Sequence, residues 1–136
     1  MKNSKRSDIV LSICIPTFNR SEILLFNLKD IICKISEYNQ IIEVIVGNNG
    51  STDNTSEILD GLTNIKIVEI SVNNGINPML IKLVKSSKGK YIWILGDDDI
   101  LNGDIIDIVI SKLKQKANKK SSFFLSGQSY SNMEVL

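Results

Sequence analysis

Short apolar runs alternate with helical repeats along most of this chain. The first run, 9–15, is rich in β-branched residues and closes at Pro16, which favours a buried parallel strand. Apolar residues then recur at helical spacing behind Asn19 and Ser21, two candidate N-caps, and predict a helix that ends near Glu37. The same alternation predicts further strands at 41–46, 65–72, 91–95 and 122–126, with helices at 54–62, 77–87 and 104–117 between them.

Polar and glycine-containing segments separate these elements. The segment 47–53 reads as a loop, Asn54 and Glu57 have the spacing of a capping box, and Asn77 before Pro78 reads as a cap followed by proline at the first helical position.

The order of the elements predicts one α/β domain over residues 1–136. Strands that alternate with helices form a mostly parallel, Rossmann-like sheet with helices on both faces and right-handed crossovers. Ligands of such sheets bind beyond the carboxyl ends of the strands. The segments expected at that edge are 17–20, 48–51, 73–75 and 97–99.

Composition narrows the function. The 136 residues carry a formal net charge of +1, and they include no histidine. Catalytic pairs or metal sites built on histidine are therefore excluded. Near-neutral charge and 6% aromatic residues argue against a nucleic-acid partner. The only basic cluster, around Lys112 to Lys120, reads as a solvated helix end, and no stretch is long enough to span a bilayer. Cys14 and Cys33 lie in apolar runs and are expected to be buried, reduced thiols.

The strongest chemical signal is the triplet Asp97, Asp98 and Asp99 after the fourth strand. Three adjacent carboxylates repel one another unless a cation shares their site. Oxygen ligands favour Mg²⁺ or Mn²⁺, which one or two carboxylates hold together with substrate phosphates, so a nucleoside diphosphate would fit. The alternative is a solvated turn that caps the following helix. Phe18, beside a strand end, is interpreted as a core residue in preference to a base-stacking one. Asn19 is interpreted as a helix cap. The glycine-rich phosphate-binding motifs GxGxxG and GxxxxGK[ST] are absent.

Three segments together resemble the family 2 glycosyltransferases of the GT-A fold. They are Ser12 to Arg20 (SICIPTFNR), Val46 to Thr55 (VGNNGSTDNT) and Gly89 to Leu101 (GKYIWILGDDDIL), and their order and spacing are specific. The resemblance implies a nucleotide-diphosphate sugar as donor, a Mn²⁺ or Mg²⁺ ion under the diphosphate, and transfer of the sugar to a hydroxyl of a glycan or lipid-linked acceptor.

The resemblance also assigns residues to the donor site. It puts Pro16, Thr17 and Phe18 around the nucleobase, Arg20 near the phosphates, and Asn48 and Asn49 facing the base. The aspartates 97–99 look like the family's DxD-type motif, with one carboxylate, such as Asp97 or Asp98, on the ribose and Asp98 or Asp99 on the metal. Two positions depart from the family pattern: Asn48 and Asn49 stand where an aspartate is common, and Leu80 and Ile81 where many members carry a polar pair.

We therefore expect the donor-binding half of a glycosyltransferase, truncated before the acceptor-binding half. No catalytic residue is identified, and the general base of inverting transfer is expected beyond residue 136. The setting implied is bacterial cell-surface polysaccharide synthesis in the cytoplasm, with peripheral association at the inner face of the membrane and self-association as candidate properties. Two rivals stay open: a noncatalytic nucleotide-sugar-binding module, and a structural α/β domain that binds no metal.

Overall fold

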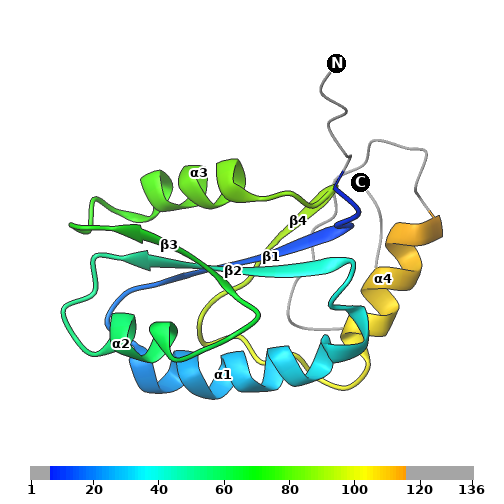
Figure 1. Ribbon diagram of the computed structural model, residues 1–136, viewed down its shortest axis with the longest axis horizontal. Coiled ribbons are helices and arrows are strands. Elements are labelled where there is room, and N and C mark those ends of the chain that lie inside the picture. Colours follow the sequence, from blue (N-terminus) through cyan, green and yellow to red (C-terminus); the bar gives the residue numbers. More distant parts are fainter. Residues whose placement is uncertain (1–6, 116–136) are drawn as a thin grey trace.

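The computed structural model describes residues 7–115 (Figure 1). The predicted strand at 122–126 lies outside these residues. The elements follow one another in the order β1 (Leu11–Thr17), α1 (Ser21–Lys34), η1, a 3₁₀ turn (Ser36–Tyr38), β2 (Ile42–Asn49), α2 (Thr55–Asp60), β3 (Lys66–Ile70), α3 (Ile76–Ser86), β4 (Tyr91–Ile94) and α4 (Ile105–Gln115).

The four strands form one parallel sheet in the order β3-β2-β1-β4, which confirms the predicted α/β class. Helices cover both faces: α1, α2 and α4 lie on one side and α3 on the other (Figure 1). The core has two parts accordingly. The larger packs β1 and β2 against α1 and α4, through residues such as Ile13, Leu28 and Ile110. The smaller lies under α3, where Met79 and Leu83 cover Cys14.

Both central strands run further toward their carboxyl ends than the sequence predicts. β2 continues through Gly47, Asn48 and Asn49 because these residues pair with Val68, Glu69 and Ile70 of β3. β1 continues through Pro16, which has no backbone N–H to donate. The backbone of Cys14 faces β4, and so does that of residue 16, because the direction alternates along a strand. Residue 16 lies beyond the last pair of β1 with β4, so no hydrogen bond of the sheet is lost there. Pairing with a neighbour has overridden the local signals for a loop.

The predicted caps of α1 and α3 are wrong, and that of α2 is right in position only. Arg20 occupies the N-cap position of α1 and Gly75 that of α3, while Asn54 is the N-cap of α2 but makes no side-chain cap bond. α3 begins at Ile76, so Pro78 lies within the first turn, where its missing N–H would have no helical partner in any case. Asp53 supplies the capping carboxylate instead: it accepts the Ser21 N–H of α1 from 32 positions away and the Thr55 N–H of α2 from two positions away.

The two cysteines differ. Cys14 is buried, and this burial raises the pKa of its thiol, which lies 3.3 Å from the Ser87 hydroxyl. Cys33 is exposed, so its predicted burial is wrong: the apolar run of α1 wraps around the helix and only part of it faces the sheet. Within residues 7–115, no helix is both long and apolar enough to cross a bilayer.

Candidate donor-binding site

The site is built where the direction of the sheet's strand order reverses. The chain leaves β1 for β2 and β3 on one side, and later returns to place β4 on the other side of β1. The loop from β1 to α1 and the loop from β4 toward α4 meet at the carboxyl edge of this point of the sheet, which is where such sheets bind ligands. At this point the buried Thr17 hydroxyl donates a 2.8 Å hydrogen bond to Oδ2 of Asp97, linking positions 80 residues apart.

Arg20 brings a positive charge to the same place. Its Nη1 lies 3.1 Å from Oδ1 of Asp97 and 3.3 Å from Oδ2 of Asp98. The guanidinium relieves the repulsion between these two neighbouring carboxylates. Asp97 is only 7% exposed, and the Asn27 side chain holds its backbone carbonyl with a 2.7 Å hydrogen bond. Asp97 is thus a fixed part of the fold, while Asp98 is exposed and free to contact a ligand.

Asp99, the last residue of the acidic triplet, turns its side chain back toward Gly96. The backbone N–H of Gly96 donates to Oδ2 of Asp99 at 2.8 Å. A Cβ on Gly96 would lie 2.8 Å from this oxygen and 3.1 Å from Oδ1 of Asp98, so the two carboxylates approach the same space beside Gly96. The alternative of a helix cap is wrong, because α4 begins only at Ile105.

Asp98 and Asp99 suit a divalent cation. Two carboxylates that converge on one small space are the protein share of a Mg²⁺ or Mn²⁺ site whose other ligands are water and phosphate oxygens. In the part of the chain that the structure describes, no group of three or more acidic or cysteine side chains forms a metal cluster. Binding of a divalent cation by Asp98 and Asp99 therefore depends on a ligand that supplies further oxygen atoms to the ion.

Asn48 and Asn49 end β2, both are buried, and they differ in their hydrogen bonds. The Asn48 amide is fully used by the protein: it donates to Ser56 and Glu69, and its oxygen accepts the Ser51 N–H at 3.3 Å. Asn48 therefore holds the loop after β2 in place.

Asn49 has an acceptor without a partner. Its Nδ2 donates to Oδ1 of Asn73 at 3.2 Å and to the Gly75 carbonyl at 3.1 Å. The Gly75 N–H also donates to Oδ1 of Asn73, so the orientation of both amides follows from the network. Oδ1 of Asn49 is buried and has no hydrogen bond among the described residues, although the residue is only 5% exposed. A buried acceptor in this state is costly unless a bound water or a ligand donates to it.

The loops after β1 and β2 are joined by side chains that the sequence analysis assigned to caps or left aside. Asn19 has a positive φ of 51° and its Oδ1 accepts the N–H groups of Thr52 and Asp53. Asp53 in return accepts the Ser21 N–H at the start of α1 and both the N–H and hydroxyl of Thr55 at the start of α2. The Thr55 hydroxyl bond is the main cause of the lowered pKa of Asp53.

Some of these residues carry a signal in the sequence. Asn27 is a polar residue between Leu24 and Leu28 on the buried stripe of α1, and a buried polar side chain needs a partner. The partners themselves lie 30 or more positions away and have no local signal.

Phe18 and Pro16 border the site. Phe18 is 41% exposed, so the interpretation as a core residue is wrong, and its ring is accessible beside the end of β1. Pro16 is half-buried within β1.

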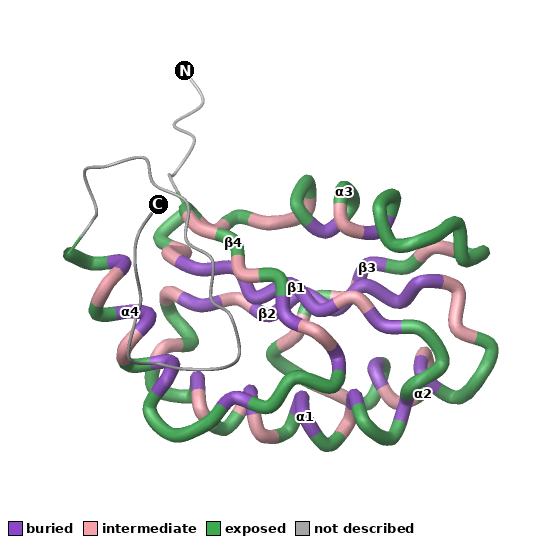
Figure 2. Tube along the Cα trace, turned by 180° about the vertical axis from the view of Figure 1, so that it is seen from behind, coloured by how far each residue is buried: buried purple, intermediate pink, exposed green. Residues whose placement is uncertain are grey.

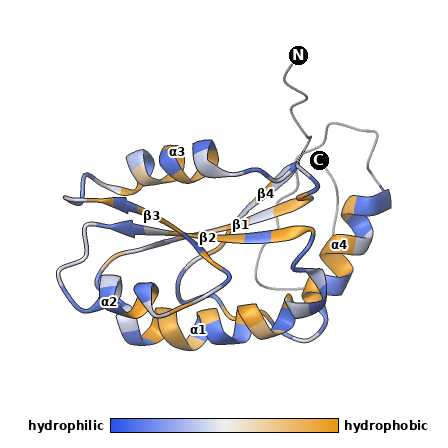
Figure 3. Ribbon diagram, in the orientation of Figure 1, coloured by the Kyte–Doolittle hydropathy of each residue, from blue (hydrophilic) through white to orange (hydrophobic). Residues whose placement is uncertain are grey.

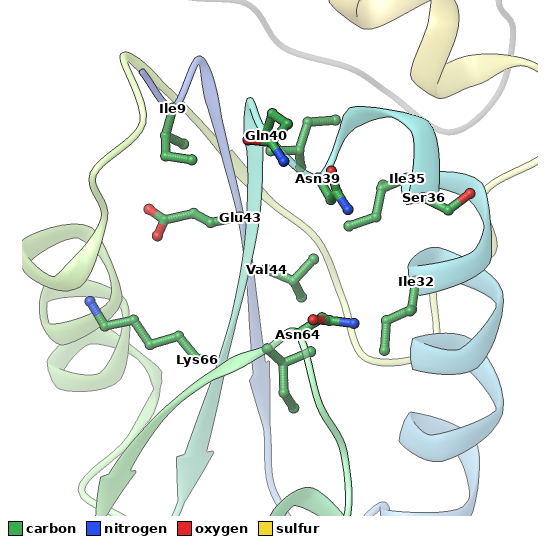
Figure 4. Close-up of a pocket in the computed structure, with 12 residues that line it drawn as sticks. Ile9, Ile32, Ile35, Ser36, Asn39, Gln40, Glu43, Val44, Asn64 and Lys66 are labelled. Carbon is green, nitrogen blue, oxygen red and sulfur yellow. The ribbon is translucent and has the colours of Figure 1, made fainter. Parts of the chain in front are cut away.

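One cavity, of about 420 Å³, lies at the opposite edge of the sheet, near the amino ends of β2 and β3. Figure 4 shows Glu43 and Lys66 on one side of it, and Ile32 of α1 and Ile35 just after α1 on the other. The charged groups are engaged within the fold: Glu43 accepts the Ser12 hydroxyl and the Lys88 N–H, and Lys66 donates to the Ser86 carbonyl.

An α/β domain with carboxylates and an arginine at its switch point is typical of proteins that bind nucleotides at the carboxyl edge of the sheet. The family comparison is more specific. The model of glycosyl transferase family 2 matches residues 12–121, and the chain belongs to this family.

Curated relatives agree with the family. The chain is 35% identical over 115 residues to the abequosyltransferase RfbV of Salmonella typhimurium, a match that covers 81% of this chain and 34% of that protein. It is 33% identical over 114 residues to the chondroitin synthase of Pasteurella multocida, covering 79% of this chain and 11% of that protein. The chain thus spans about a third or less of the relatives it matches.

Solved structures share the fold. The structure of S. aureus TarS 1–349 in complex with UDP-GlcNAc has a TM-score of 0.71 at 20% identity, covering 80% of this chain and 32% of that one. The mannosyltransferase PcManGT from Pyrobaculum calidifontis, in complex with GDP-Man and Mn²⁺, has a TM-score of 0.69 at 17% identity, covering 83% of this chain and 33% of that one. The predicted GT-A type of α/β fold is confirmed.

Proposed function

We propose that this chain forms the donor-binding part of a glycosyltransferase, which transfers a sugar from a nucleotide-diphosphate sugar to an acceptor hydroxyl. The observation that carries the proposal is the joint placement of Thr17, Arg20, Asp97 and Asp98 at the switch point of the sheet. Family membership supports the reaction class. The titles of solved structures with the same fold name UDP-GlcNAc and GDP-Man as ligands, which supports a nucleotide sugar as donor.

The residues divide the work of binding the diphosphate. Asp97, buried and bonded to Thr17 and Arg20, fixes the Arg20 guanidinium. The Arg20 side chain is half-exposed, so it can pair with a phosphate while it keeps its bond to Asp97. Asp98 and Asp99 would hold Mn²⁺ or Mg²⁺ over Gly96. When bound, such an ion neutralises negative charge on the leaving nucleoside diphosphate.

The nucleobase would lie against Phe18 and the end of β2. The accessible Phe18 ring supports stacking, with Pro16 and Thr17 forming the floor. The unpartnered oxygen of Asn49 supports this residue as the one that accepts a base N–H. Asn48, whose amide is fully bonded to the protein, instead holds the loop.

The wider assignments follow from the relatives' names. An abequosyltransferase and a chondroitin synthase support a role in bacterial cell-surface polysaccharide synthesis, with a glycan or lipid-linked acceptor. We place the reaction in the cytoplasm, at the inner face of the membrane. The general base and the acceptor site belong, in this proposal, to the part of the relatives that the chain does not span.

The test is thermal unfolding of the full chain with uridine, guanosine, cytidine and thymidine diphosphate sugars, each with and without Mn²⁺. A ligand that binds the folded state raises the unfolding temperature, and at 100 times its dissociation constant it adds about 2.7 kcal/mol. We expect a Mn²⁺-dependent shift with one nucleotide class. The Asp98→Asn/Asp99→Asn variant should unfold at nearly the same temperature without ligand and lose the shift.

Asp104→Asn/Asp107→Asn provides a matched control, since it removes two exposed carboxylates away from the acidic triplet. It should keep the shift. A folded chain that shows no shift with any nucleotide sugar, or an equal shift in both double variants, would refute the proposed donor site.

A further inference from the structure

The surface formed by α3 and β4 exposes several large apolar side chains. Ser12 and Cys14 of β1 are in register with Ile92 and Ile94 of β4, so these side chains point to one face of the sheet. Cys14 packs under α3 with Met79. Ile92 and Ile94 therefore point to the α3 side, but they are 40% and 44% exposed.

α3 adds a second apolar row. Its Met79 and Leu83 face the sheet, Lys82 on one flank donates to the Glu69 carbonyl of β3, and Ser87 on the other flank contacts Cys14 of β1. Helical geometry then turns Val84 toward β4 and Ile81 outward. Ile81 and Val84 are 56% and 47% exposed, and the outer turns of α3 are green in Figure 2.

Lysine is the prevailing charged residue on this surface, and the carboxylate beside it is bonded within the fold: Glu43 of β2 accepts the backbone N–H of Lys88 at 2.6 Å and the Ser12 hydroxyl. Between Glu69 and Asp97 the sequence has no acidic residue, and it has four lysines: Lys82, Lys85, Lys88 and Lys90. Lys85 follows Ile81 by one helical turn, next to Val84. Figure 3 shows hydrophobic and hydrophilic residues mixed along α3. These four lysines form no cluster along the sequence, because they are spread over α3 and the turn that leads to β4.

Exposed isoleucine and valine next to an excess of lysines match the chemistry of an anionic lipid surface. Apolar side chains enter the boundary between headgroups and acyl chains, and each lysine near the surface gains from the negative potential. We propose that the α3–β4 surface, made up of Ile81, Val84, Lys85, Lys88, Ile92 and Ile94, docks onto an anionic phospholipid bilayer. α1 lies on the other face of the sheet from α3 (Figure 1).

The test measures binding of the full chain to phosphatidylcholine vesicles with and without phosphatidylglycerol, by co-sedimentation. We expect binding only to vesicles with phosphatidylglycerol, weakened by high salt. Lys85→Gln/Lys88→Gln should weaken it about 25-fold, at roughly fivefold per lysine. The matched control, Lys29→Gln/Lys114→Gln, removes two exposed lysines from α1 and α4 and should bind within about twofold of the unaltered chain.

A second pair tests the apolar contribution. Ile81→Ser/Val84→Ser should reduce binding, whereas Ile23→Ser/Phe26→Ser, which changes exposed apolar residues of α1, should not. Thermal unfolding verifies that each variant is folded. Absence of binding to anionic vesicles, or equal losses in each pair and its control, would overturn the proposal. So would concentration-dependent dimerisation that Ile81→Ser/Val84→Ser abolishes, because a second copy would then cover the surface.

Discussion

The two edges of the sheet are built on opposite principles. At the amino edge there is a 420 Å³ cavity, mainly lined by isoleucine and uncharged polar side chains, whose Glu43 and Lys66 are bonded within the fold. At the carboxyl edge, buried polar groups converge and one of them, Oδ1 of Asn49, has no partner among the described residues. The contrast teaches that unsatisfied or half-satisfied polar chemistry identifies a candidate site in this fold better than the size of a cavity does.

The carboxyl edge should be the less tolerant of change, and Gly50 gives the largest expected effect. It has a φ of +72°, and a Cβ there would lie 2.6 Å from the backbone nitrogen of Asn73 and 2.8 Å from the carbonyl carbon of Val72. Gly50→Ala combines backbone strain with a backbone collision and should lower the free energy of unfolding by about 3 kcal/mol in urea denaturation.

Gly61→Ala is the matched control, since Gly61 has a φ of −80° and its nearest contact would be an ordinary 3.5 Å. It should leave the stability unchanged or raise it by up to about 1 kcal/mol. Equal free energies of unfolding of Gly50→Ala and Gly61→Ala would contradict the expectation that the carboxyl edge is less tolerant of change.

Asn49→Asp sharpens the comparison within the carboxyl edge. The carboxylate would replace an amide that donates to the Asn73 side chain and the Gly75 carbonyl. We expect a loss of about 2 kcal/mol at neutral pH. The deficit should shrink in acid, where protonation restores one donor. Asn49→Asp should also speed hydrogen exchange at the Gly75 N–H, because the loop at Asn73 loses its bonds to Asn49. Asn48→Asp is the control: it also loses donated bonds, but it leaves the loop at Asn73 in place and should not change exchange at Gly75. A neutral-pH stability equal to that of the unaltered chain would contradict the assigned network.

The lowered pKa of Asp53 predicts a smaller, pH-dependent effect on the free energy of unfolding. Because its pKa is lowered in the folded chain, it contributes stability that is present above its unfolded pKa of about 3.9 and is lost as the pH falls through the folded value. Since the carboxylate is exposed, the contribution should be under about 1 kcal/mol. Urea denaturation at neutral pH and at roughly pH 3 should show a smaller acid loss in Asp53→Asn than in the unaltered chain. A larger acid loss in the variant would contradict the bonds that Asp53 accepts.

The smallest effect is expected at the amino edge. Gln40 lines the cavity, far along the strands from Arg20 and Asp97. Gln40→Ala should change the affinity for a nucleotide sugar by less than about twofold, within the ordinary range of a surface substitution. Isothermal titration calorimetry measures this directly. A tenfold loss of affinity would mean that the two edges are coupled and that the cavity takes part in binding.

Local patterns in the sequence predicted much of the fold. β-branched runs and helical repeats gave four of the described strands and the helices between them, and their order gave a parallel sheet, because periodicity follows from backbone geometry alone. The candidate site was predicted as a set of segments for the same reason: in a parallel sheet, the residues that follow each strand must meet at one edge.

Which residue of the candidate site is buried or bonded to the protein was decided by the tertiary structure. Asn48 and Asn49 are neighbours with the same side chain, yet one is fully bonded and the other keeps a free acceptor, because pairing with β3 extends β2 through both and points them to different partners. Arg20 pairs with both Asp97 and Asp98, but only Asp97 is also bonded by Thr17 and by the buried Asn27 side chain, 80 and 70 positions away, so Asp97 is buried and Asp98 is exposed. The sequence by itself determined which segments meet at the candidate site. Only contacts between distant segments decided which side chains hold the loops and which keep exposed or unpartnered atoms, since no local pattern encodes a partner so far along the chain.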